Sequence, residues 1–389
     1  MRDSPTLNVL IVGGGSAALE AAFRLQRVAE NRVDTTILAP EDQFATHAMA
    51  VLVPFAAGDI PHESLAQMAR DAGAHLHRGR MVSVDTDAHQ VLTADSETLD
   101  YDVLLIAVGA VQRTPSHHVL AFGGPGTEER MHGLVQDLEA GYVRRIAFVV
   151  PLGATWPVPL YELALMSADR AYEMNLNPEL TLVTAEAAPL GLFGAEASDA
   201  LSARLLNRGI AVHTAVGVEI PSAGVVELQP GGGRLSVDRV VSLPILDGPA
   251  VKGIPHDARG FLPVDRHGRV EGAADVYAAG DVTHHRIKQG GLASQQADAA
   301  AEAIAARAGA AIEPEPYAAV LQGVLLTERA ATYLRRDASA GSVIPDQAIW
   351  WPPTKIAGRE LSRHLGSLSR HAAAVRSEGL EIRHPVDGA

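Results

Sequence analysis

The segment LNVLIVGGGSAALEAAFRLQRVA, residues 7–29, joins an apolar run, a glycine turn and a stretch with helical apolar spacing. Residues 7–12 are short, apolar and β-branched, which is typical of a buried parallel strand. Gly13, Gly15 and Ala18 fit the pattern Gly-x-Gly-x-x-Gly/Ala. In that context the glycines let the backbone approach a pyrophosphate, which then lies against the amides at the helix N-terminus. The segment therefore predicts a dinucleotide site.

The second strand of this unit is predicted at residues 35–38, and its end departs from the usual pattern. An acid is expected there to hold the adenosine ribose. The strand runs instead into Ala39-Pro40, and Glu41 and Asp42 follow. Two interpretations stay open. Glu41 or nearby backbone groups, including those at Pro40, hold the ribose, or the two acids are solvated loop residues.

Two later segments identify the cofactor. YDVLLIAVGA, residues 101–110, and ADVYAAGDV, residues 274–282, each predict a buried strand that ends in a turn of small residues. The three segments in this order resemble the FAD-binding half of the pyridine nucleotide–disulfide reductase superfamily. The resemblance implies that Asp281 accepts hydrogen bonds from the ribityl chain. It also implies that the helix beginning near Gly290 and Gly291 points its N-terminus at the flavin ring.

We therefore expect FAD, held non-covalently because the chain has no cysteine for a thioether link. The predicted contacts to it are Gly13, Gly14, Gly15, Ser16, Ala17, Ala18, Pro40, Glu41, Val82, Ala107, Val108, Gly109, Gly280, Asp281, Gly290 and Gly291.

The spacing of these segments predicts an α/β protein with two doubly wound, Rossmann-like domains and a C-terminal segment. The FAD-binding domain is discontinuous, residues 1–115 and 236–310. Residues 116–235 form an inserted NAD(P)-type domain. Its first turn, Pro151-Leu152-Gly153-Ala154-Thr155-Trp156-Pro157, keeps one glycine and places Trp156 and Pro157 at the expected helix N-terminus. We therefore expect no NAD(P)H binding at a standard site.

Within that superfamily, residues 151–166, 180–194 and 240–265 resemble the sulfide:quinone oxidoreductase branch and, more distantly, type II NADH dehydrogenases. The likeness covers roughly residues 5–310. Members of that branch pass sulfur and electrons through cysteines beside the flavin, and this chain has none. The resemblance therefore implies fold and cofactor but excludes cysteine-based sulfide oxidation. The missing thiolates also exclude disulfides and thiolate metal sites, and no metal site is predicted.

Redox chemistry must then use other side chains near the flavin. His47, His284 and Lys288 are the candidate catalytic residues, because His or Lys can supply a proton as the flavin is reduced or reoxidised. The alternative for each is a hydrogen bond to phosphate, backbone or water.

Residues 311–389 differ in sequence pattern from the rest of the chain. Residues 318–327 have a helical pattern. Trp350 and Trp351 predict either a wall of the substrate pocket or an apolar plug. A leucine stripe through Leu361, Leu365 and Leu368 lies among basic residues. It predicts a packing face, a homodimer contact or peripheral membrane contact.

Composition limits the remaining functions. The 389 residues are 47% hydrophobic and 20% charged, typical of a globular protein. A net charge of −14 argues against nucleic acid as a partner. No signal peptide or membrane span is predicted, so the expected location is cytoplasmic. Three hypotheses remain: an FAD enzyme linking a small donor to a quinone or similar acceptor, an NAD(P)H-dependent flavin reductase with an irregular site, or a non-catalytic flavin-binding sensor.

Overall fold

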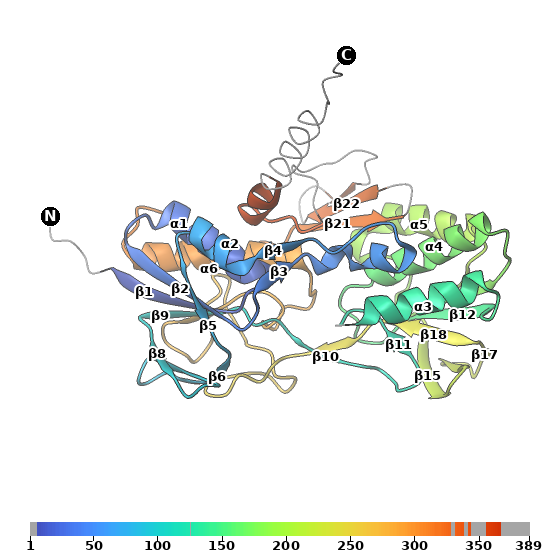
Figure 1. Ribbon diagram of the computed structural model, residues 1–389, viewed down its shortest axis with the longest axis horizontal. Coiled ribbons are helices and arrows are strands. Elements are labelled where there is room, and N and C mark those ends of the chain that lie inside the picture. Colours follow the sequence, from blue (N-terminus) through green and yellow to red (C-terminus); the bar gives the residue numbers. More distant parts are fainter. Residues whose placement is uncertain (1–5, 125, 328–330, 338–340, 344–354, 367–389) are drawn as a thin grey trace, which may run out of the picture.

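A computed structural model describes residues 6–124, 126–327, 331–337, 341–343 and 355–366. Two parallel sheets lie side by side along the long axis of the molecule, each with its own helices (Figure 1). The C-terminal strands lie above the junction between them. The predicted α/β class with two Rossmann-like units is confirmed.

The first unit is a five-stranded sheet in the order β20-β9-β1-β2-β5. Its strands are β1 (Leu7–Val12), β2 (Val33–Ala39), β5 (His75–Arg78), β9 (Val103–Ile106) and β20 (Val276–Ala278), and all neighbours are parallel. Side chains alternate between the two faces of a strand, so β1 contributes side chains to a hydrophobic core on each face of the sheet. Val9 and Ile11 pack with α1 (Ser16–Val28), α2 (Leu65–Asp71) and α6 (Gly290–Arg307). Leu10 and Val12 pack on the side of the antiparallel sheet β6-β7-β8 (Met81–Asp85, Gln90–Thr93, Thr98–Asp100).

The second unit repeats this plan. Its parallel sheet has the order β11-β18-β12-β13-β14, with strands Leu120–Ala121, Arg239–Ser242, Arg145–Val150, Glu179–Thr184 and Ala211–His213. Helices α3 (Thr127–Glu139), α4 (Val158–Glu173) and α5 (Ala195–Asn207) share one core with this sheet. The antiparallel sheet β15-β16-β17 (Gly217–Ser222, Val225–Gln229, Arg234–Ser236) packs on its other face.

Two connecting strands join the units. β10 (Val111–Arg113) leaves the first unit, and β19 (Ile245–Asp247) pairs with it antiparallel on the return. β18 belongs to the second sheet because it pairs with β12. The chain therefore re-enters the first unit after Ser242, later than the boundary at residue 236 drawn from the sequence.

The C-terminal segment corrects one prediction. The helix expected at residues 318–327 is a strand, β21 (Leu321–Leu326), paired antiparallel with β22 (Ala331–Asp337), which pairs with β23 (Gly341–Val343). Leu321 and Leu325 join the core of the second unit against α4. Packing on that existing helix layer, together with strand pairing, overrides the local helical pattern.

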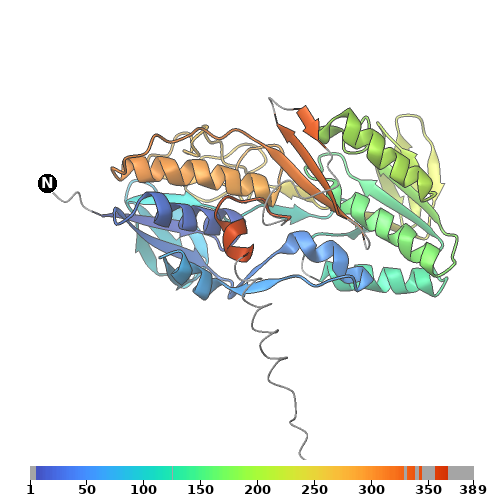
Figure 2. The ribbon, with the colours of Figure 1, turned by 90° about the horizontal axis from the view of Figure 1, so that it is seen from above.

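Residues 361–366 form one short helix beside α1 and α6, visible in red in Figure 2. Leu361 is buried, and Leu365 packs against the same core of the first unit. The described part of the leucine stripe is therefore a packing face, and membrane and homodimer contacts stay predictions. Within the described ranges, no helix is both long and apolar enough to cross a bilayer. Leu368, Trp350 and Trp351 lie outside these ranges.

Candidate active site

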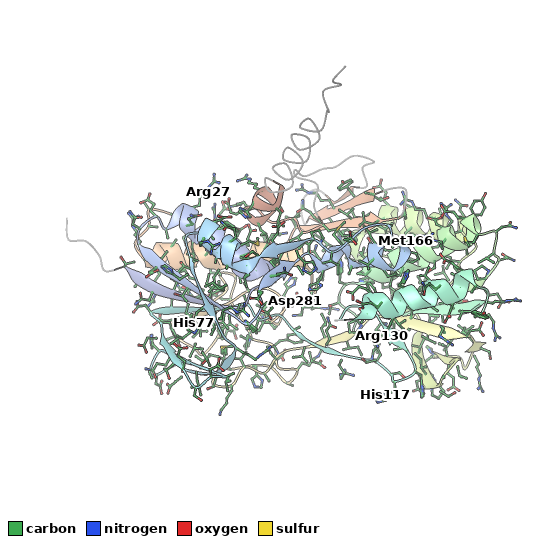
Figure 3. All side chains as sticks on the ribbon, viewed as in Figure 1. Arg27, His77, His117, Arg130, Met166 and Asp281 are labelled. Carbon is green, nitrogen blue, oxygen red and sulfur yellow. The ribbon has the colours of Figure 1, made fainter. Side chains whose placement is uncertain are left out.

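A cavity of about 980 Å³ opens between the two units, where β1, β9, β12 and β20 end. Parallel α/β sheets commonly bind ligands at this carboxyl edge. Figure 3 shows Asp281 near the middle of the molecule, between the units. The cavity is lined by all three nucleotide-site segments predicted from the sequence, and also by residues of the second unit and the C-terminal segment.

The glycine turn 13–15 has the shape that a pyrophosphate needs. Gly13 has a φ of +128°, and a Cβ there would collide with the carbonyl oxygen of Ala107. Gly15 is the N-cap of α1, and a Cβ there would meet nothing within 4 Å. No side chain of the described residues caps the first turn of α1. The helix therefore presents free amides to open space, which fits a bound phosphate.

Glu41 lies beside this turn. A Cβ added to Gly14 would come 3.5 Å from its Oε2 atom. Pro40 and Glu41 both line the cavity. This position favours the ribose-binding interpretation over a solvated loop acid, and the contact itself stays a prediction.

Asp281 faces the cavity from the loop after β20. Within the described part of the chain, no hydrogen bond reaches its carboxylate, and burial raises its pKa while nearby Lys288 lowers it. Hydrogen bonds on both sides of Asp281 hold this turn, because the Gly280 N–H and the Thr283 hydroxyl both donate to Gln296 at 3.0 Å. A half-buried carboxylate at the cavity with unused acceptor capacity fits the ribityl hydroxyls of FAD.

Lys288 lines the cavity just before α6 and is only 5% exposed. Its Nζ donates to the carbonyl oxygen of Thr283 and lies 3.9 Å from the centre of the Phe261 ring. Burial lowers its pKa to about 8, and the Asp281 charge opposes this shift. An amine whose pKa lies this near neutrality can hold or release a proton during turnover.

The predicted site residues divide into those that line the cavity and those that do not. Those that line the cavity are Gly13, Gly14, Gly15, Ser16, Ala17, Pro40, Glu41, Val82, Ala107, Val108, Gly109, Gly280, Asp281, Gly290, His47 and Lys288. Ala18 and Gly291 are buried behind it, Ala18 in the core of the first unit. His284 is exposed and away from the cavity, where its Nδ1 accepts from the Val264 N–H at 3.2 Å. The turn after Asp281 points this side chain outward, so His284 is not brought to the site.

The nucleotide turn of the second unit is poor in amide donors. Pro157 is the N-cap of α4 and Pro159 follows in its first turn, and neither has an N–H. The Leu160 N–H donates back to the Pro157 carbonyl at 3.0 Å. The Trp156 indole packs edge-on against Phe193, with ring centres 5.8 Å apart, and also lines the cavity. This helix end therefore offers a bound phosphate little.

One ion pair at the cavity has no counterpart in the sequence prediction. Lys355 Nζ lies 2.7 and 2.8 Å from the two carboxylate oxygens of Glu162, which is fully buried on α4. Burial raises the pKa of Glu162, against the effects of Lys355 and of the Leu326 N–H, which donates at 2.6 Å. The only hint in the sequence is an acid inside the apolar start of α4. Its partner lies 193 residues away.

Two Rossmann-like units around a cavity, with a glycine turn at a helix N-terminus and a carboxylate at Asp281, are typical of flavin-dependent oxidoreductases. The family profile of pyridine nucleotide-disulphide oxidoreductases matches residues 7–297, and the chain belongs to that family. The protein is accordingly an FAD-dependent oxidoreductase, so the non-catalytic hypothesis is set aside.

Relatives and solved structures agree with this class. An NADH dehydrogenase-like protein of Mycobacterium tuberculosis is 26% identical over 297 residues, 72% of this chain and 73% of that protein. The sulfide:quinone oxidoreductase of Aquifex aeolicus superposes with a TM-score of 0.79 at 17% identity, over 87% of each chain. The structure of NDH2 from Plasmodium falciparum with NADH gives 0.60 at 17% identity, over 72% of this chain and 64% of that one.

Proposed function

We propose that this enzyme passes electrons from a small donor other than NADH or NADPH through non-covalent FAD to a quinone or similar acceptor, without redox cysteines. The main support for this proposal is the lack of amide donors at the start of α4. Pro157 and Pro159 remove amide donors where a dinucleotide pyrophosphate would need them. The second unit is therefore better suited to shaping the cavity than to binding a second nucleotide.

The part of the cavity away from the predicted FAD contacts suits an uncharged ring. Apolar side chains line it: Phe122, Trp156, Leu243, Pro244, Leu246, Val324 and Ile356. Of the charged residues that also line the cavity, Lys355 is neutralised by Glu162. Apolar walls with a few polar groups are typical of small-molecule pockets. The similarity to a sulfide:quinone oxidoreductase structure supports a quinone as the probe to try first.

FAD, when bound, supplies the two-electron chemistry. The chain's own residues position it and handle protons. Asp281 would offer an acceptor to the ribityl hydroxyls, and the amides of the α1 N-terminus would hold the pyrophosphate. Lys288 can hold or release a proton on Nζ at the cavity wall, and Glu162 holds the Lys355 Nζ in place at the same cavity.

Anaerobic stopped-flow mixing tests the donor half of the proposal. We expect NADH and NADPH to bleach the flavin slowly and without saturation. The acceptor half needs no natural donor, because enzyme reduced by dithionite can be mixed with a soluble short-chain quinone. Rapid, saturable reoxidation is expected.

A matched pair of variants locates the acceptor pocket. Trp156→Ala removes a cavity wall and should raise the quinone concentration for half-maximal reoxidation about tenfold, the value of one buried large apolar group. Leu152→Ala on the same turn changes a side chain that is 77% exposed and should have no effect. Equal kinetics in both variants would place the acceptor elsewhere.

One observation favours a second candidate, an NAD(P)H-dependent flavin reductase. Gly153 has a φ of +89° with nothing within 4 Å of an added Cβ, so the turn has room to move aside. The similar protein of Mycobacterium tuberculosis is named NADH dehydrogenase-like. Rapid, saturable bleaching by either nucleotide would put this function first.

A further inference from the structure

We propose that Glu20 of α1 and Asp298 of α6 share one proton, which latches residues 355–366 over the cavity and is lost as the pH rises. The three elements lie together in Figure 2, with the red C-terminal helix beside α1 and α6. The proposal does not depend on the identity of the donor or the acceptor.

Glu20 holds the C-terminal helix directly. Its Oε1 accepts from the Glu360 N–H at 2.7 Å, and its Oε2 accepts from the Leu361 N–H at 2.9 Å. Both carboxylate oxygens thus cap the helix at residues 361–366, and the Glu20 side chain is fully buried. Glycine at position 358 leaves room for this contact, because a Cβ there would collide with Glu20 Oε2. The Glu20 carboxylate therefore holds the start of this helix in place.

The same segment closes one side of the cavity. Lys355 and Ile356 line it, and an added Cβ at Gly290, the first residue of α6, would lie 3.2 Å from Ile356. The Ser362 hydroxyl donates to the Ile356 carbonyl at 2.6 Å and accepts from the Gly358 N–H at 2.8 Å. These bonds tie the capped helix to the cavity wall, so releasing the helix would also loosen Lys355 and Ile356.

The close arginine contacts around the latch go to two of its four acids, Glu302 and Glu360. Glu302 pairs with Arg24 at 2.5 Å and with Arg359 at 3.3 Å. Glu360 pairs with Arg24 and Arg27, each at 3.2 Å, and with Arg363 at 3.7 Å. Glu20 and Asp298 are therefore the two acids whose negative charges are least compensated by arginine.

Among the described residues, the cations nearest Asp298, Arg359 and Arg24, make no close contact with it. Its Oδ2 lies 3.9 Å from Arg359 Nε, and its buried Oδ1 has no hydrogen-bond partner within the part of the chain that the structure describes. Its carboxyl group is within hydrogen-bonding reach of Glu20, whose own oxygens already accept two N–H groups. A proton on Asp298 supplies the missing donor between two acceptors. Burial and the Glu20 charge raise the pKa of Asp298 to about 8.

Other titratable groups also lie near the segment. His364 packs on Phe23 and lies 3.5 Å from Asp71, with Glu63 also near. Burial lowers the pKa of His364 below its ordinary 6.5, so its titration lies on the acid side. The arginines keep their charge throughout. Lys288 at the cavity also has a pKa of about 8, and burial raises the pKa of Glu162, which pairs with Lys355 of the segment. A pH dependence that is lost in Asp298→Asn therefore identifies the Glu20–Asp298 pair as its source.

The direction of the effect follows from proton linkage. The latched state keeps the Asp298 proton up to about pH 8, whereas in an opened state that carboxyl group returns to its ordinary acidic pKa. Opening therefore releases a proton and becomes about tenfold more favourable for each pH unit up to about 8, and constant above it.

Hydrogen exchange followed by mass spectrometry tests this on the full-length holoenzyme at pH 6.5, 7, 7.5, 8 and 9. After correction for intrinsic exchange rates, peptides covering residues 356–366 should show opening that rises about tenfold per pH unit and levels off near pH 8. Asp298→Asn keeps a donor toward Glu20 without an ionisable proton, so its opening should not change over this range. The exposed Asp95→Asn should behave as wild type.

Two results would overturn the latch: pH-independent opening in the wild type, or an Asp298→Asn variant with the wild-type slope. If Asp298→Asn does not fold, infrared spectra of the wild type decide. A protonated-carboxyl band present at pH 7 and lost by pH 9 is expected, and a spectrum without it rejects the shared proton. None of these readouts uses turnover, so they stand or fall separately from the proposed electron donor and acceptor.

Discussion

Gly15→Val separates cofactor binding from folding more cleanly than any other change at the glycine turn. The backbone at Gly15 has φ −87° and ψ −172°, an extended conformation that valine adopts readily. A Cβ there meets no atom within 4 Å and points into open space at the start of α1. The new side chain would therefore occupy the place of the pyrophosphate without disturbing the fold.

The expected sizes of the two effects differ widely. Stability of the apoprotein should change by no more than about 0.5 kcal/mol, because no native contact is lost. FAD affinity should fall at least a hundredfold, about 2.7 kcal/mol or more, since the phosphate loses its approach to the helix amides. Flavin absorbance after purification and titration of the apoprotein with FAD measure the second effect, and thermal melts of the apoprotein measure the first.

Gly13→Ala is the matched control for this variant. Its Cβ would collide with the Ala107 carbonyl, and its φ of +128° is unfavourable for alanine. It should lower the melting temperature of the apoprotein, which Gly15→Val should not. Full flavin occupancy in Gly15→Val would refute the assignment of this turn to the pyrophosphate.

Three further changes test other parts of the site. Asp281→Ala removes a charged acceptor at the cavity, worth about 1.5–3 kcal/mol, and should weaken FAD binding roughly ten- to a hundredfold in equilibrium titrations; unchanged affinity would show that the ribityl chain does not contact Asp281. Lys355→Met leaves Glu162 buried without a cation and should cost about 3–5 kcal/mol in chemical denaturation; Lys355→Met/Glu162→Leu should recover part of it, because the Leu326 N–H then loses its acceptor. Burial lowers the pKa of Lys288 from 10.5 to about 8, so the unfolded chain binds more protons between these values. Stability of the wild type relative to Lys288→Met should therefore rise from pH 8 to 10.5, and parallel curves would show that this amine is not desolvated.

The sequence alone was sufficient wherever the chemistry lies in consecutive residues. The strand, glycine turn and helix of residues 7–29 form a local unit, because the backbone freedom of glycine and the apolar period are properties of neighbouring positions. The prolines at the start of α4 are equally local, since a missing N–H does not depend on what packs nearby.

Only the tertiary structure decided which distant side chains meet. Lys355 pairs with Glu162 over 193 residues, and Glu20 caps a helix 340 residues later in the chain. Residues 318–327 have a helical pattern, yet β21 forms there because strand pairing and burial against α4 outweigh a weak local preference. His284 is close to Asp281 in sequence, but the turn between them directs one side chain to solvent and the other to the cavity. Such choices depend on the free energy of packing the whole chain, which no local pattern contains.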